Sequence, residues 1–414
     1  MSLLVISHLT DHLTLLQDAL TLNTKKQRER FNTSIYEEMK LRSKSVIPAR
    51  EKVNNNRNNN DSGVSAKLLN GKSEQRALLY NVNDVPPGLH ESFVKTGYRK
   101  PNSTTWECLQ SLFYINNESF NMWSHIIAVL YFIVRYTVVL LDLKQPSSPQ
   151  RDFYWPMLSS FIGTITVYTL SATAHVFNSK SEKMHRVFYF FDYAGISIYT
   201  YTSGQVMYYY NRPTNTQWRI FDSALLYTFL GAGLSFLATF YSCKSKVHLQ
   251  KYGPVIRTIA VFAGWINTVL APTVGVTICS CHDVTTCLSF VSCNDLLITY
   301  YWRHCFCSIA GGVIYGSRLP ERLLPGTFDI IGSSHHFLHI FGALSTEYAF
   351  KILEVALESR QDPKNEILAQ SLTEISSFET LLPTIVVFAV NIAIAFWFAK
   401  SIYNSKDPVS KNEM

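Results

Sequence analysis

Four ionisable side chains that could act together lie within otherwise apolar stretches of the chain: His175, Asp192, His335 and His339. His335 and His339 are four residues apart, so on a helix they are neighbours on one face and can bind the same ion. His175 would complete the three-histidine set of a zinc site that leaves one position open for water. Asp192 could orient or deprotonate that water. Ser171, four residues before His175, could hydrogen-bond it or a substrate oxygen.

A second assignment of the same residues is a nucleophilic triad of Ser171, His175 and Asp192. This alternative leaves the pair His335 and His339 without a role, and the sequence around Ser171 lacks the turn that exposes a nucleophile. The zinc site accounts for more of the residues, and we therefore favour it.

The other polar residues of the apolar stretches have simpler explanations. A single histidine in a helix bundle is usually a core residue, as we expect for His125 and His304. His336 could pair with the histidine three residues after it. We expect Arg135 and Arg303 to extend to the membrane interface or to line an internal polar cavity.

The composition and the distribution of apolar residues indicate a membrane protein. Of the 414 residues, 47% are hydrophobic and 16% are charged, whereas a soluble domain is about a quarter charged. The apolar residues form blocks of about twenty, the length that crosses a hydrocarbon core about 30 Å thick. We therefore predict an all-α, polytopic transmembrane bundle. The eight expected spans lie at about 123–141, 153–177, 187–209, 223–241, 258–280, 297–315, 329–346 and 381–399.

This pattern divides the chain into five segments. The first segment, residues 1–84, is expected to be disordered, because its Asn-rich run and basic patch have little apolar surface to bury. Its stretch 9–22 has helical spacing and is expected to form only a transient helix. The segments are a cytosolic tail (1–84), an amphipathic juxtamembrane segment (85–122), a seven-helix zinc-binding core (123–350), an extracellular loop with the eighth helix (351–400) and a cytosolic tail (401–414).

The basic residues indicate an orientation rather than a nucleic-acid partner. The net charge is +7, but Lys and Arg concentrate in the first segment and in short loops between spans. With the N-terminus inside, the loops at 180–186, 244–257 and 318–322 face the cytosol and carry much of this charge, in agreement with the positive-inside rule. Both termini are then cytosolic. The same count of spans places His175, Asp192, His335 and His339 in the cytosolic leaflet.

Half of the eight cysteines crowd the segment between the fifth and sixth spans, at Cys279, Cys281, Cys287 and Cys293. Because this segment is expected outside, disulfides are favoured over a metal site. Cys279 and Cys281 cannot easily bridge to each other, so their bonds would run to Cys287 and Cys293.

Four motifs resemble the progestin and adiponectin Q receptor family, which is related to hemolysin III. The resemblance covers about 85–400 and is closest to the membrane progestin receptors, because of Gly97-Tyr98-Arg99, Pro325-Gly326 and the eighth helix. The four motifs are the stretches 117–125, 171–175, 191–195 and 320–322 with 334–339.

The resemblance implies zinc ligation by His175, His335 and His339, with Asp192 reaching the water at the metal and Ser171 beside it. It also implies a cavity between the helices that is open to lipid-like molecules, a steroid (progestin) in this branch. A ceramidase activity that releases sphingosine and a fatty acid is implied as well. The chain departs from the family at one place, where a histidine at 336 stands in the position of the usual Gln.

Two classes of function follow. The first is a steroid-responsive signalling receptor of the plasma membrane, acting on a G protein or another cytosolic effector and coupled to ceramide hydrolysis. The second is a zinc-dependent intramembrane ceramidase without a receptor role. A transporter is disfavoured because no inverted repeat or broken helix pair is apparent. A conventional G-protein-coupled receptor is disfavoured because its Asp-Arg-Tyr and Asn-Pro-x-x-Tyr signatures are absent.

Overall fold

The computed structural model describes residues 79–148, 150–249, 252–283, 285, 287–362, 365 and 375–404. All of them belong to one compact unit, Glu74–Met414. The predictions for the first 78 residues, including the disordered tail and the helical stretch at 9–22, lie outside the described residues. The same is true of the last ten residues of the C-terminal tail.

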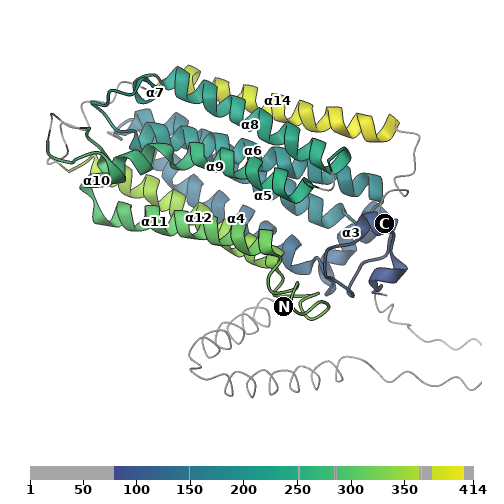
Figure 1. Cartoon of the computed structure of the whole chain (residues 1–414). Coiled ribbons are helices and arrows are strands. Elements are labelled where there is room, and N and C mark those ends of the chain that lie inside the picture. The colour runs from purple at the N-terminus through teal and green to yellow at the C-terminus, as the bar shows by residue number, and fades with distance from the viewer. Residues whose placement is uncertain are drawn as a thin grey trace, which may run out of the picture. The chain divides into compact units, whose positions relative to one another are not determined.

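Eight long helices, one for each predicted span, make up most of the described part of the chain, and the all-α class is thereby confirmed. In Figure 1 they run side by side, with short helices α7 (Arg219–Asp222) and α10 (Phe290–Cys293) at one end and α3 (Thr105–Gln110) at the other. The long helices are α4 (Ser119–Leu143), α5 (Tyr154–Phe177), α6 (Glu182–Asn211), α8 (Ala224–Val247), α9 (Gly253–Thr277), α11 (Asp295–Ser317), α12 (Ser334–Ser359) and α14 (Ser377–Asn404). Single 3-10 turns lie at Val82–Asp84, Pro87–Leu89, Ser111–Phe113 and Arg151–Phe153.

The described residues contain five helical segments that are long and apolar enough to cross a membrane: α4, the stretch Arg151–Phe177 that includes α5, α8, α9 and α14. The chain is therefore an integral, multi-pass membrane protein. The helices α6, α11 and α12 are as long but more polar. For α6 the reason lies in its position, since it packs against α5, α8, α9 and α14 and buries most of its side chains. A helix enclosed in this way does not need an apolar surface toward lipid.

Helix α12 begins and ends later than the sequence analysis expected. It runs from Ser334 to Ser359, so residues 351–359 are helical and not part of a loop. The helix continues because Ile352, Leu353 and their apolar neighbours are buried in the core.

Arg135 of α4 forms ion pairs with α12 instead of extending to the membrane interface. Its guanidinium lies 2.7 Å from a carboxylate oxygen of Glu354 and 3.4 Å from one of Glu347. Lys351 lies 3.7 Å from Glu347 on the same helix. These pairs explain how α12 can hold several charges within a membrane bundle, because opposite charges in contact avoid much of the penalty of burial in lipid. Arg303 lies over the ring of Tyr348.

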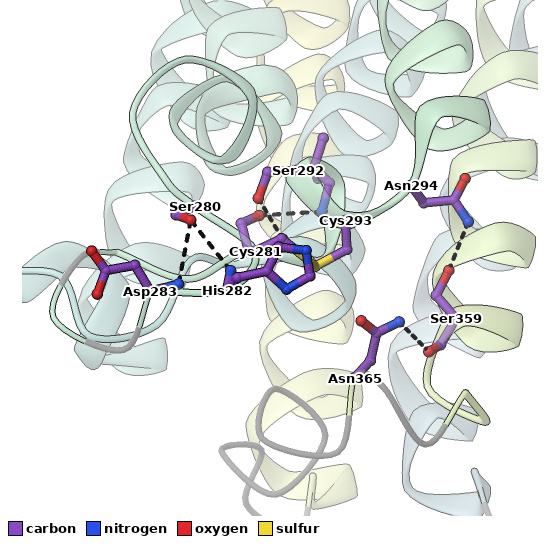
Figure 2. Close-up of a disulfide and its surroundings, with 11 residues drawn as sticks. Ser280, Cys281, His282, Asp283, Ser292, Cys293, Asn294, Ser359 and Asn365 are labelled. Carbon is purple, nitrogen blue, oxygen red and sulfur yellow. Dashed lines mark hydrogen bonds between the residues drawn. A yellow bond between two sulfur atoms is a disulfide. The ribbon is translucent and has the colours of Figure 1, made fainter.

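Two disulfides, Cys279–Cys287 and Cys281–Cys293, close the segment between α9 and α11. The predicted pairing of the two early cysteines with the two later ones is confirmed. Figure 2 shows the second bond and the contacts beside it, where the Ser280 hydroxyl oxygen accepts from the backbone N–H of His282. Asn294, which follows the second bond, donates to the Ser359 hydroxyl at the end of α12, at 3.1 Å.

Candidate metal centre

Three histidines meet where α5 ends and α12 begins, at the end of the bundle that carries α3 (Figure 1). Each of His175, His335 and His339 offers a ring nitrogen, and these three atoms lie within 4.8 Å of one another. His175 is 1% exposed and His339 7%, and His335 is half-buried. Three imidazole nitrogens are a donor set that suits a divalent transition metal such as zinc, bound at about 2.0–2.1 Å. The group can therefore hold a metal ion.

Two of the rings are oriented by hydrogen bonds at Nδ1. The Nδ1 of His175 lies 2.8 Å from Oε2 of Glu118, and that of His339 lies 2.9 Å from the hydroxyl of Ser124. When Nδ1–H donates to such a partner, Nε2 carries the lone pair that binds a metal. The structure therefore presents Nε2 of His175 and His339 as ligand atoms.

The Glu118 carboxylate is itself held by other polar groups. It is 4% exposed, and its oxygens accept hydrogen bonds from the side-chain amides of Asn121 and Asn178, each at 2.8 Å. A buried carboxylate is tolerated when its oxygens are satisfied in this way. Glu118 is thus a fixed anion beside His175.

Arg99 fixes the last turn of α5, which carries His175. The buried guanidinium donates to the carbonyl oxygens of His175 at 2.6 Å and Val176 at 2.8 Å. It also donates to Oδ1 of Asn178 and to the hydroxyl of Ser111. The last carbonyls of a helix have no partner within the helix, and here one arginine satisfies two of them.

The start of α12 is fixed by its caps. The backbone N–H of Ser333 donates to Nδ1 of His336 at 3.1 Å, and the His336 N–H donates to the Ser333 hydroxyl at 3.5 Å, which is a capping box. Glu321 accepts from the backbone N–H and the hydroxyl of Ser334. A capping box usually has Glu or Gln at this position. His336 therefore acts as the capping residue, a role that Glu or Gln usually takes, and it leaves His335 to face the other two histidines.

Asp192 and Ser171 lie beside the three histidines, and both are buried. The Ser171 hydroxyl interacts with the Asp192 carboxylate. Oδ1 of Asp192 is buried without a hydrogen-bond partner among the residues that the structure describes. A buried oxygen of this kind is usually satisfied by water or by a ligand. The catalytic roles of Asp192 and Ser171 remain predictions.

His125, which the sequence analysis treated as a core residue, is a neighbour of the metal centre. Its Nε2 lies 3.2 Å from Nε2 of His339 and 3.5 Å from the Ser171 hydroxyl. The sequence contained a pattern that could have identified His125 as a residue of the site. Glu118, Asn121 and His125 stand at positions i, i+3 and i+7 and form one polar face at the start of an apolar helix.

His304 occupies the position expected of a core residue. Its Nδ1 lies 2.9 Å from the backbone oxygen of Ser345, on the neighbouring helix α12. Ser345 lies later on α12 than both histidines of the metal centre.

A small polar cavity adjoins the three histidines. Its volume is about 30 Å³, and the residues that line it include Glu118, Asn121, Arg318 and His335. A water molecule needs about 10–15 Å³ of such volume, so the cavity can hold water next to His335.

The three histidines lie within a part of the chain that is similar to known proteins. The model of a family described as Haemolysin-III related matches residues 113–349. "Membrane progestin receptor gamma-A" of Danio rerio is 26% identical over 353 residues, which cover 81% of this chain and 97% of that protein. "Membrane progestin receptor delta" of Homo sapiens is 30% identical over 288 residues, with 68% and 80% covered. "Membrane progestin receptor gamma" of Homo sapiens is 28% identical over 339 residues, with 80% and 96% covered.

Proposed function

The chain belongs to the haemolysin-III-related family, and on that premise we propose that it is a membrane receptor for a progestin-like steroid or a related lipid, with zinc held by His175, His335 and His339. The steroid class follows from the names of the relatives at 26–30% identity. One observation carries the proposal: three imidazoles from two distant stretches of chain meet within 4.8 Å inside a membrane bundle.

Zinc at this position would supply a Lewis acid and a covalent link between α5 and α12. The chain's own residues prepare the site. Glu118 and Ser124 orient two imidazoles through Nδ1, and the caps of α12 place His335 opposite them.

We extend the proposal to the topology: all eight long helices span the bilayer, seven surround the metal centre, α14 is the eighth, and both termini are cytosolic. The disulfides Cys279–Cys287 and Cys281–Cys293 support this orientation, because such bonds persist in an oxidising compartment. The metal centre lies at the opposite end of the bundle, together with the basic loops. The plasma membrane is the proposed location, and the segment boundaries are those expected from the sequence, except that the seventh helix extends to Ser359.

Zinc content and steroid binding of the purified protein in lipid nanodiscs test the proposal. We expect one zinc per chain, lost in His335→Ala and His339→Ala but retained in His248→Ala, whose side chain is exposed at the end of α8. Radiolabelled progesterone should bind saturably to the zinc-loaded protein. A zinc-loaded protein that binds no steroid from a progestin panel would end the receptor proposal, and zinc retained by His339→Ala would end the proposed ligand set.

A ceramidase activity is the second candidate, and the position of Asp192 favours it. The unpartnered Oδ1 of Asp192 lies in a buried site with Ser171 and the three histidines, where a water molecule or an amide carbonyl could be bound. Purified protein should then release sphingosine from ceramide, and Asp192→Asn should stop the release without removing the metal. If steroid binds and zinc is present but no sphingosine appears, the metal is structural.

A further inference from the structure

Three cations, from α8, α9 and the residue after α11, gather at the metal-centre end of the bundle, and each lies over a tyrosine ring. The side-chain charge is 4.8 Å from the ring centroid for Lys246 and Tyr189. The distance is 5.9 Å for Arg257 and Tyr193, and 4.5 Å for Arg318 and Tyr315. We call Lys246, Arg257 and Arg318 the basic cluster. Lys246 interacts electrostatically with both of the others, so the three charges face a common region.

Two of the three tyrosines join the cluster to the metal centre. The ring of Tyr189 lies 6.0 Å from that of His175, and the ring of Tyr315 lies 5.4 Å from that of His335. Arg318 also lines the small cavity that His335 borders. A group bound to the cluster would therefore lie next to the metal centre.

The cluster carries an excess of positive charge. Within the described ranges, none of its members forms an ion pair with a carboxylate. Glu91 attracts both Lys246 and Arg318. Asp192 also attracts Lys246 and Glu321 attracts Arg318, but Arg186 adds a fourth positive charge close to Lys246. Four cations facing three carboxylates leave one positive charge that a further anion can balance.

A buried polar atom beside the cluster also lacks a partner. The Nδ1 of His185 has no hydrogen bond in the described part of the chain, and His185 is 5% exposed. Its ring lies 4.7 Å from Tyr189 and it interacts electrostatically with Lys246. An unsatisfied atom at this place indicates that water or a polar ligand group reaches the cluster.

We propose that Lys246, Arg257 and Arg318 form a binding site for the phosphate of an anionic lipid, beside the metal centre. Aromatic rings hold cations in fixed positions, and basic pockets between transmembrane helices bind anionic lipid headgroups. All three side chains are partly exposed and lie in the last turn of α8, the second turn of α9 and the residue after α11. This is the level of the headgroups, which favours a lipid over free phosphate. The site does not depend on the steroid or the zinc.

The site is tested by native mass spectrometry, which detects the lipid that stays bound to the protein. The protein is released from phosphatidylcholine vesicles that contain some phosphatidylglycerol. We expect wild type to retain phosphatidylglycerol, and Lys246→Gln and Arg318→Gln to bind it at least about tenfold more weakly, about 1.4 kcal/mol. Lys246→Arg should restore retention. The matched control is Lys244→Gln, two residues away on α8 over the ring of Phe240, which should behave as wild type.

Thermal unfolding in detergent reports whether each variant is folded, independently of lipid and of zinc. A second arm adds inorganic phosphate: if phosphate displaces the lipid at low concentration, the site takes the free anion, and the lipid assignment is wrong. Equal retention by wild type, Lys246→Gln and Lys244→Gln would overturn the site itself. If Lys246→Gln fails to fold, Arg257→Gln decides the outcome in its place.

Discussion

The Glu118 carboxylate shows how single side chains prepare the metal centre. It is buried, accepts from two asparagine amides and lies 2.8 Å from Nδ1 of His175. Such a carboxylate sets the tautomer of the imidazole and raises its basicity as a ligand. His125 and Ser124 occupy comparable positions beside His339. The metal centre therefore consists of more than its three ligand histidines, because the hydrogen bonds of several neighbouring side chains hold these histidines in place.

Glu118→Gln is expected to weaken zinc binding by about 10–100-fold, the usual effect of removing such a partner. The amide keeps the shape of the side chain but loses the negative charge that stabilises Nδ1–H of His175. Competition with a fluorescent zinc chelator measures the affinity. Glu107→Gln is the control, because Glu107 lies on α3 and pairs with Lys100 at the surface. Equal zinc affinities for the two variants would show that Glu118 does not support the ligand.

The helices are brought together by small residues as well as by polar contacts. On α5, Gly163 faces Thr202 of α6, and a Cβ at Gly163 would lie 1.8 Å from the threonine hydroxyl oxygen. Small residues allow helix backbones in membrane bundles to approach closely. This contact matters for the site, because α5 carries His175 and α6 carries Asp192.

Gly163→Ala is expected to destabilise the bundle by about 1–3 kcal/mol, the range for overpacking a filled interface. Thermal unfolding in detergent measures the change. Gly233→Ala is the control, since a Cβ there meets nothing within 4 Å, and it should be neutral or stabilising. Adding Thr202→Ala to Gly163→Ala should recover part of the loss, and the absence of any loss in Gly163→Ala would contradict the close packing of α5 and α6.

Helix α3 supports a pH prediction. The ammonium group of Lys100, followed by the backbone N–H of Thr104, lowers the pKa of Glu107 from 4.5 to about 2. A carboxylate with a lowered pKa stabilises the folded state above its ordinary pKa, and this contribution disappears as the pH falls from about 4.5 toward 2. The effect is small because the pair is at the surface. Wild type should lose stability relative to Glu107→Gln over this pH range; parallel curves would contradict the prediction.

For the whole molecule, the metal centre joins parts of the bundle that otherwise pack loosely. Helices α11 and α12 pack mainly on each other, with fewer contacts to α4, α6 and α9. His335 and His339 belong to this pair, whereas His175 belongs to α5 at the other side of the metal centre. The ion would therefore hold the α11–α12 pair against the remaining helices, together with Arg135 and its partners on α12.

Removing zinc is expected to lower the melting temperature of the wild type. A ligand present at about 100 times its Kd stabilises the folded state by about 2.7 kcal/mol, and a strong chelator would remove that contribution. Hydrogen exchange should increase at the start of α12. The His335→Ala variant provides the comparison, because it should melt at the lower temperature with or without chelator. A chelator that shifts both proteins equally would mean that the ion acts elsewhere.

The sequence by itself determined the helices, the multi-pass membrane class, the pairing rule for the cysteines and the three histidines. Composition and spacing suffice for these features because they are local: a run of about twenty apolar residues forms a span, and residues four apart share a helix face. The number of spans between His175 and His335 then puts both at one end of the bundle.

The tertiary structure alone decided which groups hold those histidines. Glu118 lies 57 residues from His175 along the chain, and Ser124 lies 215 residues from His339. The extension of α12 to Ser359 likewise depends on burial and on ion pairs with Arg135. Local patterns do not encode such contacts, because the free energy of a buried polar group depends on the partner that packing brings to it.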